Sequence, residues 1–570
     1  MNNNIFKLSE KISEENLDGY IVPKNDEFFN EYSYPDRLKS VTNFSGSAGL
    51  AVFLKEKKYL FVDGRYTAQA KKQSGKNFFI NEIPNKYPFE ILKKFKKKLK
   101  IGYDPKLFTK ENLLRLFKNK QNLLPINNNL VDNVCYNKFK GEKIHSFFTL
   151  KKEVAGESPS RKIRKLRQFI ISKKIDLIFI SAPENVAWLL NLRGSDNPHS
   201  PIPNSRLIVT KNEIYLFCNL KKTKNIKKQK SYKNIKFFEL EDFSKVIKKI
   251  KGKNIGIDKK SCSIFYEILI SQNFKIKSFD DPCYNFKSIK NNIEIKNMKK
   301  AHIEDGVALT KFLYFIKNQK KISLTEIDAE KKLVSFRRKQ KNYIYPSFNT
   351  IAGSGPNSAI IHYRSSKKTN RKLSKKELFL VDSGGQYKFG TTDVTRTVCF
   401  SNQSNNIKNI FTRVLKGHIG VAMSNISKLK NGKNIDKIAR KYLKEVSLDF
   451  KHGTGHGVGY FLNVHEGPQA ISNNNEVPLK HGMILSNEPG YYKENSYGIR
   501  IENLVYIKKR NSKIFFKNLT MAPIDTDLIN YQLLDKREKD YLYKYHLEVY
   551  NKLSKYLNNK EKLWLKNLIK

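Results

Sequence analysis

Five acidic and imidazole side chains stand in short stretches of the chain between residues 382 and 502. They are Asp382, Asp393, His456, Glu488 and Glu502. Carboxylates are hard ligands and imidazole is a borderline one. Such a set suits Mn²⁺, Co²⁺ or Zn²⁺ and argues against a thiolate site. Because carboxylates can bridge two ions, five side chains are enough for a pair. The residue types therefore predict a dinuclear metal site of the hydrolytic kind.

The two aspartates belong to predicted strands. Asp382 ends the stretch LFLVD, whose apolar residues make a buried carboxylate costly without a cation. In TTDVTRT the two-residue period of a strand puts Asp393 on the threonine-rich face and Val394 on the other. For either aspartate alone, an ordinary turn residue near Gly384 and Gly385 is the better interpretation. Together with three further ligands, we favour the metal site.

The two glutamates also lie on or beside predicted strands. In YGIRIEN, Glu502 shares a strand face with Arg500, while two isoleucines point the other way. A surface ion pair is the commoner fate of such residues. Apolar residues flank this strand on both sides, however, which favours an inner strand. Glu488 precedes Pro489, so we expect extended backbone there, at the end of a strand.

Three of the ten histidines, His452, His456 and His465, are close together in the sequence. The spacing of His452 and His456 imitates a helical metal-binding pair, but the interleaved glycines would break a helix. We therefore expect a glycine loop with His456 as the ligand. A single histidine is more often a core residue with its hydrogen bonds satisfied, and the clustering reverses that preference.

Longer motifs point to a known family. DGYIVPKNDEF, FVDGRYTAQA, NLRGSDNPHSPIPNS, VDSGGQYKFGTTDVTRT, HGTGHGVG, SNEPGYY and LTMAPIDTDLI span nearly the whole chain. With them, the sequence resembles the pita-bread metallopeptidases, and among these the long, three-domain Xaa-Pro aminopeptidases (aminopeptidase P). The resemblance implies two divalent metal ions, with Mn²⁺ expected and Co²⁺ or Zn²⁺ as alternatives. It also implies that Asp382 chelates one ion, that Asp393 and Glu502 bridge both, and that His456 and Glu488 complete the shells.

The resemblance assigns further roles that spacing alone does not give. His362 and His465 match histidines that contact the substrate carbonyl and shuttle protons, and Glu488 is the candidate proton acceptor. Arg65 matches a first-domain arginine that reaches a substrate site across a homodimer. Three residues match positions that shape the pocket for the proline after the scissile bond: His452, Tyr492 and Arg500.

The expected reaction follows from these roles. Two ions about 3.5 to 4 Å apart lower the pKa of a shared water, and the resulting metal-bridging hydroxide attacks the scissile carbonyl. One metal ion, with Asp382, holds the free α-amine of the substrate and so restricts cleavage to the first residue. The imidazoles of His362 and His465 stabilise the oxyanion. A pocket shaped for a proline ring at the second position selects the substrate.

The periodicity of the chain indicates three regions. Strand-like and lysine-rich helical stretches alternate in an N-terminal α/β domain over 1–150 and again in a second α/β domain of similar pattern over 159–285. A C-terminal catalytic domain over 290–570 opens with a long helix near 285–305 and combines helices with strands. The expected fold class is thus α/β N-terminal domains plus an α+β pita-bread domain with a curved, mainly antiparallel sheet.

Composition sets the remaining expectations. The net charge of +56 is typical of polyanion-binding proteins, but the lysines are spread along the chain without a recognised nucleic-acid motif. In the lysine run 93–100, the apolar residues from Ile91 to Leu99 have helical spacing and predict an ordinary amphipathic helix. Five scattered cysteines, no export signal and no long apolar run favour a reduced cytoplasmic protein without a membrane segment.

Two alternatives stay open at this point. An X-Pro dipeptidase or a general aminopeptidase on the same fold would use the same ligands. A non-catalytic relative that binds proteins or nucleic acid is disfavoured, because such proteins usually lose metal ligands and all five are present here.

Overall fold

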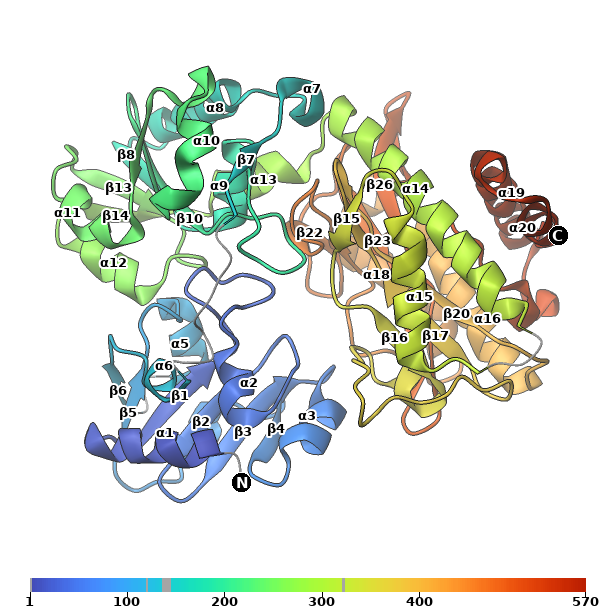
Figure 1. Cartoon of the computed structure of the whole chain (residues 1–570), viewed down its shortest axis with the longest axis horizontal. Helices are drawn as coiled ribbons and strands as arrows, with labels where there is room; N and C mark the ends of the chain where they lie inside the picture. Colours follow the sequence, from blue (N-terminus) through green and yellow to red (C-terminus); the bar gives the residue numbers. More distant parts are fainter. Residues whose placement is uncertain (1–2, 119–120, 136–144, 320–322, 570) are drawn as a thin grey trace. The chain divides into compact units, whose positions relative to one another are not determined.

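The chain forms two compact units in a computed structural model that describes residues 3–118, 121–135, 145–319 and 323–569. The first unit holds residues up to 152 together with 157–283, and the second holds 153–156 and the rest from 284. Figure 1 shows the first unit in blue to green and the second in green to red.

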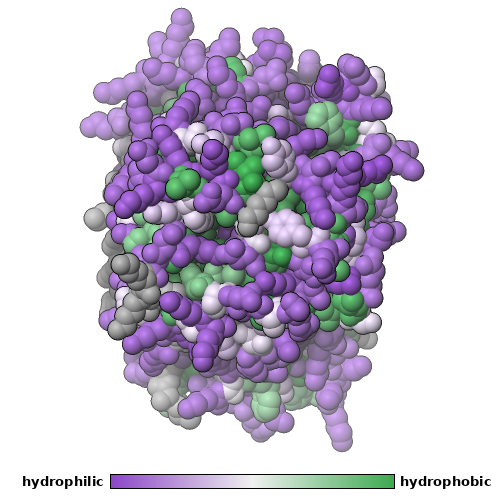
Figure 2. Space-filling view, turned by 90° about the vertical axis from the view of Figure 1, so that its right-hand side faces the viewer, coloured by the Kyte–Doolittle hydropathy of each residue, from purple (hydrophilic) through white to green (hydrophobic). Residues whose placement is uncertain are grey.

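Hydrophilic side chains dominate the side of the molecule that Figure 2 shows, and the apolar residues form small, separate spots on it. This agrees with the excess of lysine in the sequence. The five cysteines, all within the described residues, are buried thiols that form no disulfide with one another. Among the helices that the structure describes, none combines the length and the apolar character that a membrane span requires.

The first unit begins with a six-stranded sheet in the order β4-β3-β2-β1-β5-β6. Strand β2 runs antiparallel to both β1 and β3, whereas β4 pairs with β3, β5 with β1 and β6 with β5 in parallel. Successive residues of β1 face opposite cores, since Tyr20 packs with α1 and α2 and Ile21 packs with α4 and α5. The elements are β1 (Gly19–Pro23), β2 (Leu50–Leu54), β3 (Lys58–Asp63), β4 (Phe79–Ile83), β5 (Lys100–Tyr103), β6 (Asn122–Pro125), α1 (Asn3–Glu14), α2 (Arg37–Thr42), α3 (Thr67–Ser74), α4 (Pro88–Leu92), α5 (Lys110–Phe117) and α6 (Leu130–Cys135).

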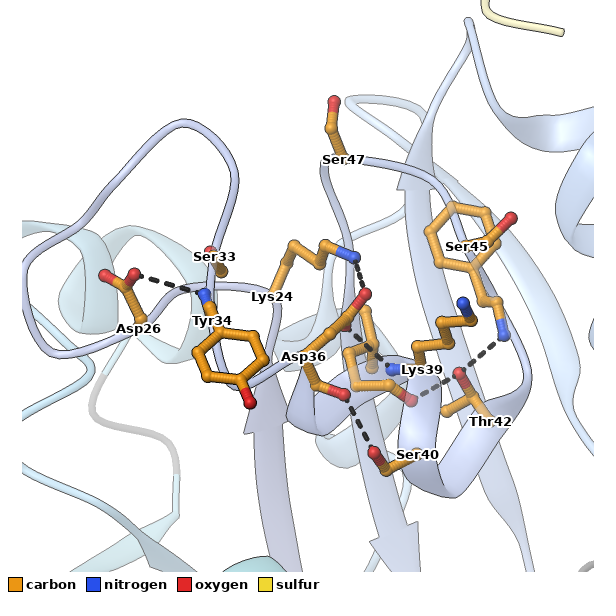
Figure 3. Close-up of polar contacts among 12 residues, drawn as sticks. Lys24, Asp26, Ser33, Tyr34, Asp36, Lys39, Ser40, Thr42, Ser45 and Ser47 are labelled. Carbon is orange, nitrogen blue, oxygen red and sulfur yellow. Dashed lines mark hydrogen bonds and ion pairs between the residues drawn. The ribbon is translucent and has the colours of Figure 1, made fainter. Parts of the chain in front are cut away.

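Local hydrogen bonds fix the ends of α2, and they are drawn in Figure 3. The Asp36 carboxylate accepts the backbone N–H of Lys39 and so caps the helix N-terminus. The same carboxylate accepts the ammonium of the buried Lys24 at 2.6 Å. At the other end, the Thr42 hydroxyl donates to the Leu38 carbonyl one turn earlier. The short helix is therefore held at both ends by its own side chains.

The second sheet of this unit repeats the first. Its order is β12-β11-β10-β8-β13-β14, and each pair of neighbours runs in the same relative direction as its counterpart in the first sheet. Helices α11 and α12 pack on one face through a core that contains Phe243 and Tyr266. The elements are β8 (Leu177–Ile180), β10 (Ser205–Thr210), β11 (Ile214–Cys218), β12 (Ile235–Phe238), β13 (Asn254–Ile257), β14 (Lys275–Ser278), α8 (Pro159–Ser172), α9 (Pro183–Leu189), α11 (Phe243–Ile247), α12 (Ile264–Ser271) and α13 (Pro282–Ser288).

The prediction of an amphipathic helix across the lysine run 93–100 is wrong. Helix α4 ends at Leu92, residues 93–97 form turns and bends, and β5 begins at Lys100. Like charges three and four residues apart destabilise a helix, and this run places lysine at nearly every such position. The lysines are nevertheless exposed, as expected.

The second unit is built from small antiparallel sheets with helices outside them. Every strand pairing described in this unit is antiparallel. The strand orders are β15-β18-β19, β16-β17-β20, β22-β21-β23-β26-β27 and β24-β25. The strands are β15 (Tyr343–Pro346), β16 (Ile351–Ser354), β17 (Phe379–Ser383), β18 (Gly385–Tyr387), β19 (Gly390–Thr391), β20 (Val394–Val398), β21 (Gly455–Gly457), β22 (Glu466–Ile471), β23 (Ile484–Asn487), β24 (Gly490–Lys493), β25 (Tyr497–Arg500), β26 (Asn503–Arg510) and β27 (Lys513–Asn518).

The helices of this unit cover the apolar sides of the sheets. Helices α14 and α15 pack on β17 and β20, while α16 and α19 pack against β25 and α18 packs against the five-stranded sheet. This arrangement confirms the expected fold class. The helices are α14 (Asn292–Lys317), α15 (Glu326–Arg338), α16 (Asn405–Ala422), α18 (Gly432–Lys444), α19 (Lys536–Leu553) and α20 (Asn559–Lys566).

Candidate metal centre

Two adjacent strands bring the two aspartates together. Asp382 lies in β17 and pairs with Thr395 of β20, and Asp393 immediately precedes β20. Both side chains are buried. The antiparallel register of these strands therefore places carboxylates that are separated in sequence at the same end of the sheet.

His456 and Glu488 come from a second pair of neighbouring strands. His456 is the middle residue of β21, and Glu488 directly follows β23, which pairs with β21. The backbone N–H of His456 donates to the Ser486 hydroxyl, and that hydroxyl donates to the Glu488 carboxylate at 3.0 Å. A Cβ on Gly455 would lie 2.0 Å from the Ser486 carbonyl oxygen, so the glycine is needed for the close approach. The predicted glycine loop is corrected here: it contains a short strand.

The two pairs of strands converge on one cluster. His456 Nε2 lies 3.5 Å from a carboxylate oxygen of Asp393 and 3.4 Å from one of Glu488. Glu502 lies between β25 and β26. It is held beside the cluster by Thr395, whose carbonyl accepts the Glu502 N–H and whose hydroxyl donates to the Glu502 carboxylate at 2.7 Å. Ligand atoms of Asp393, His456 and Glu502 lie within 4.8 Å of one another.

The His456 ring is oriented as a metal ligand would be. Its Nδ1 lies 2.8 Å from the Gly457 carbonyl and donates to it, which leaves Nε2 facing the carboxylates of Asp393 and Glu488. An unprotonated nitrogen does not hydrogen-bond a carboxylate, so either a proton or a cation must stand between them. A backbone acceptor on the remote ring nitrogen is the usual support of a metal-bound histidine.

Electrostatics of the cluster also call for cations. Burial raises the pKa of Asp382 to about 7, and the charges of Asp393 and Glu488 add to this while Arg500 opposes it. Burial likewise raises the pKa of Glu488, and that of Glu502 lies well above its ordinary value. Burial lowers the pKa of His456, but the hydrogen bond with Asp393 and the neighbouring carboxylate charges outweigh it and raise it to about 9.

One carboxylate oxygen of the cluster has no hydrogen-bond donor among the described residues. Asp382 Oδ1 is buried without a hydrogen bond from any of the residues that the structure describes. Buried carboxylates that lack donors are costly, and a divalent ion removes that cost. The donor set, its charge and the orphaned oxygen therefore fit two divalent ions.

A second group of possible ligand atoms already has a cation. Cys399, Asp525 and Asp527 also lie close enough together to hold an ion. The ammonium of Lys317 stands among them, 2.8 Å from each of the two carboxylates. We therefore assign the candidate metal centre to the cluster around His456.

Polar residues connect the cluster to the predicted substrate pocket. Arg500 donates to the carboxylate of Asp382 at 2.7 Å and to the hydroxyl of Tyr492 at 2.6 Å. The Tyr492 hydroxyl lies 2.9 Å from Nε2 of His452, whose Nδ1 is 2.8 Å from the Gly453 carbonyl. The three residues predicted to shape the proline pocket are thus joined to one another and to Asp382.

The remaining predicted residues differ in placement. The ring of His465 lies against that of His456, with the ring centroids 4.1 Å apart. His362 is half-buried and follows Ile361, whose carbonyl accepts a hydrogen bond from Arg500. Arg65 lies in the other unit, where it forms an ion pair with Asp63 at 2.7 Å.

Comparisons with known proteins agree with this geometry. Residues 296–509 match the model of metallopeptidase family M24, and 514–570 match the C-terminal region of peptidase M24. Residues 5–132 and 141–294 each match a creatinase/prolidase N-terminal domain. A probable Xaa-Pro aminopeptidase P of Coprinopsis cinerea is 36% identical over 98% of this chain and 96% of its own length. The Xaa-Pro aminopeptidase 1 of Dictyostelium discoideum is 35% identical over 99% of this chain and 96% of its own length.

The chain belongs to metallopeptidase family M24. Within this family of metal-dependent hydrolases it groups with the Xaa-Pro aminopeptidases P. A solved X-prolyl aminopeptidase from Caenorhabditis elegans, described as a cytosolic enzyme with a di-nuclear active site, superposes with a TM-score of 0.92. It is 29% identical and the match covers 100% of this chain and 99% of that one.

Two hydrogen-bonding residues of this M24 site were not singled out from the sequence. The Thr395 hydroxyl contacts both Glu502 and Arg500, and Ser486 connects His456 to Glu488. Thr395 shares the strand face of Asp393, so the two-residue period carried a signal for it. Ser486 had none, because its role depends on the pairing of β21 with β23.

Proposed function

We propose that this M24 protein is an aminopeptidase that releases the first residue of peptides with proline at the second position. The observation that carries the proposal is the convergence of Asp393, His456 and Glu502 on one point, with ligand atoms within 4.8 Å of one another. The names of its relatives and of the C. elegans structure support the choice of substrate.

We propose that five residues hold two divalent ions, with Mn²⁺ expected and Co²⁺ or Zn²⁺ as alternatives. The residues are Asp382, Asp393, His456, Glu488 and Glu502. Bound divalent ions would acidify a water molecule and polarise the scissile carbonyl. The four carboxylates of this set would balance the charge of two divalent ions.

The chain's own groups then serve the reaction. The Glu488 carboxylate, which lies 3.4 Å from Nε2 of His456, is the group that takes a proton from the attacking water. His465, beside His456, and His362 donate to the oxygen of the scissile carbonyl as negative charge develops there. Asp382 attracts the free α-amine of the substrate, which restricts cleavage to the chain end.

The residues around Tyr492 form the proposed proline pocket. His452, Tyr492 and Arg500 are linked by hydrogen bonds, so their side chains are held in fixed positions. A tertiary amide before proline has no N–H, and a rigid pocket for the ring selects it without needing that donor. We also propose that the protein is a cytoplasmic homodimer in which Arg65 of one subunit approaches the substrate of the other.

The decisive experiment uses protein stripped of metal and refilled with Mn²⁺, Co²⁺ or Zn²⁺. We expect release of the first residue from X-Pro-Y tripeptides and longer peptides, little activity on X-Ala-Y, and about two ions per chain. Cleavage of X-Pro dipeptides in preference to tripeptides would instead assign an X-Pro dipeptidase. Protein that binds no metal under these conditions would be a non-catalytic relative.

A further inference from the structure

Arg440 holds the segment that leads into the metal-binding strand. It lies in the last turns of α18 (Gly432–Lys444), and the loop after this helix runs through 449–454 to β21. The side chain is 12% exposed. One terminal nitrogen donates to the Asp449 carboxylate and to the Phe450 carbonyl, both at 2.7 Å. The other donates to the His452 carbonyl, also at 2.7 Å.

The same guanidinium also packs on an aromatic ring. Its carbon lies 4.0 Å from the ring centroid of Phe450, and that ring lies 4.9 Å from the ring of His452. Arg440 therefore fixes both the backbone carbonyl of His452 and the ring on which the imidazole rests. A planar guanidinium is suited to such a combination of forked hydrogen bonds and stacking, and a lysine ammonium is not.

Asp436, one turn earlier on the helix, holds the other end of the loop. Its carboxylate accepts Nε of Arg440 at 2.8 Å and the Thr454 hydroxyl at 2.6 Å. The Thr454 carbonyl in turn accepts the N–H of Glu488. Asp436 is almost completely buried. One ion pair on α18 thus anchors the loop on both sides of His452.

The anchored imidazole faces the proposed substrate pocket. His452 Nε2 lies 2.9 Å from the Tyr492 hydroxyl, which accepts a hydrogen bond from Arg500. Because the His452 carbonyl and ring are both held from the side of α18, a change at Arg440 alters the position of His452 relative to Tyr492. No contact that the structure describes joins Arg440 directly to a candidate metal ligand.

We propose that Arg440 is a positioning residue for substrate specificity, which acts through Phe450 and His452 to set the wall of the pocket after the scissile bond. This inference rests on the proposed aminopeptidase function. It predicts that loss of the guanidinium weakens the binding of the residue at the second position of the peptide and leaves the metal centre in place.

The test is the variant Arg440→Lys in the metal-loaded enzyme with an X-Pro-Y tripeptide. We expect KM to rise about tenfold, equivalent to about 1.4 kcal/mol, with kcat and metal content nearly unchanged. In a His452→Ala background the same substitution should change kcat/KM by less than about twofold, because residues that act as a unit are not additive. Equal effects in both backgrounds, or an unchanged KM, would overturn the proposal.

Arg413 offers a matched control. It lies on α16 and donates to the Tyr442 carbonyl at 2.8 Å and to Glu445 at 3.1 Å, so it also fastens the end of α18. None of the contacts that the structure describes for Arg413 reaches the loop 449–454. Arg413→Lys should therefore leave KM and kcat unchanged, and a KM increase like that of Arg440→Lys would contradict a specific role of Arg440.

A second readout is independent of activity. In the metal-free protein, Arg440→Lys should increase hydrogen exchange of the amides in 449–454, and Arg413→Lys should not. If Arg440→Lys does not fold, Asp449→Asn removes the charge of one surface partner of the guanidinium and should raise KM in the same direction by a smaller factor. If the wild-type protein proves inactive but Arg440→Lys still exchanges faster than the wild type in 449–454, the anchoring is supported and the aminopeptidase function is refuted. Unchanged exchange in 449–454 refutes the anchoring itself.

Discussion

At the scale of single residues, the backbone decides which histidine is the ligand. The Gly457 carbonyl occupies Nδ1 of His456 and leaves Nε2 facing Asp393 and Glu488. His452 also has a backbone partner on Nδ1, but its Nε2 faces the Tyr492 hydroxyl. The two imidazoles have the same tautomer and differ in what the second nitrogen meets. One site is suited to a cation and the other to a neutral partner.

His456→Ala should therefore remove activity through loss of metal. We expect the variant to keep the fold, to bind fewer than two ions and to lose at least about 100-fold in kcat/KM, in line with the loss of a metal-supporting group. Metal analysis, circular dichroism and tripeptide hydrolysis measure these three quantities. His481→Ala is the control, since His481 also contacts a backbone carbonyl, that of Ile507, but lies outside the cluster. A fully active His456→Ala protein would refute the proposed site.

The raised pKa values predict how the metal-free protein responds to pH. The Asp382 pKa rises from 3.8 to about 7 on folding, so its contribution to stability is complete below pH 4 and is lost as pH rises through 7. The pKa of His456 is raised from 6.5 to about 9, so its contribution to stability is also lost as pH rises, but at higher pH than that of Asp382. We expect the melting temperature to fall between pH 5 and pH 8.

Asp382→Asn removes the titrating carboxyl and should flatten this fall in thermal melts of the metal-free protein. Added divalent ion should also flatten it in the wild type, because metal displaces protons and binds more tightly at high pH. Parallel pH profiles for wild type and Asp382→Asn would contradict the raised pKa.

At the scale of elements, the sequence predicted strands better than it predicted where they meet. The FLVD part of LFLVD lies in β17 and the VTRT part of TTDVTRT lies in β20, and Glu488 directly follows a strand as expected. Glu502 was expected to share a strand with Arg500, but it lies between β25 and β26. The helix predicted from the apolar spacing within 93–100 was wrong, because that spacing takes no account of the repulsion between the lysines. The short strand around His456 was missed because interleaved glycines have low strand propensity, and its pairing with β22 and β23 makes it a strand. Such long-range pairings cannot be read from local spacing.

A buried ion cluster holds the β21–β22 hairpin in place. Glu466, the first residue of β22, directly follows His465 and accepts Lys290 and Lys287, the latter at 3.3 Å. The three side chains are at most 3% exposed. Lys287 lies near the end of α13 and Lys290 lies between α13 and α14. The cluster therefore ties the start of the second unit to the hairpin.

Glu466→Gln should destabilise the protein by about 3 kcal/mol, because breaking a buried ion pair leaves an uncompensated charge. Urea unfolding measures the change in the free energy of unfolding. The pair of Lys433 with Glu476 is a matched control on the surface, with side-chain exposures of 42% and 68%. Glu476→Gln should change stability by less than about 1 kcal/mol. Similar effects of the two substitutions would show that the buried cluster has no special weight.

At the scale of the whole molecule, the chain repeats one sheet topology and adds a different unit. The two six-stranded sheets have the same order and directions. We propose that they belong to separate domains, 1–150 and 159–285, followed by a catalytic domain over 290–570. The residues of the proposed metal centre all come from the last of these. Only Arg65 requires another domain.

The net charge of +56 predicts weak, non-specific attraction to nucleic acids rather than a binding function. Lysines that are spread over a surface release counterions without reading bases, so affinity depends steeply on salt. We expect fluorescence anisotropy to show binding of DNA duplexes at about 50 mM salt that is lost by about 200 mM salt and is indifferent to sequence. Saturating DNA should leave tripeptide hydrolysis unchanged at the higher salt. Sequence-selective binding that persists there would require a nucleic-acid site in addition to the proposed peptidase centre.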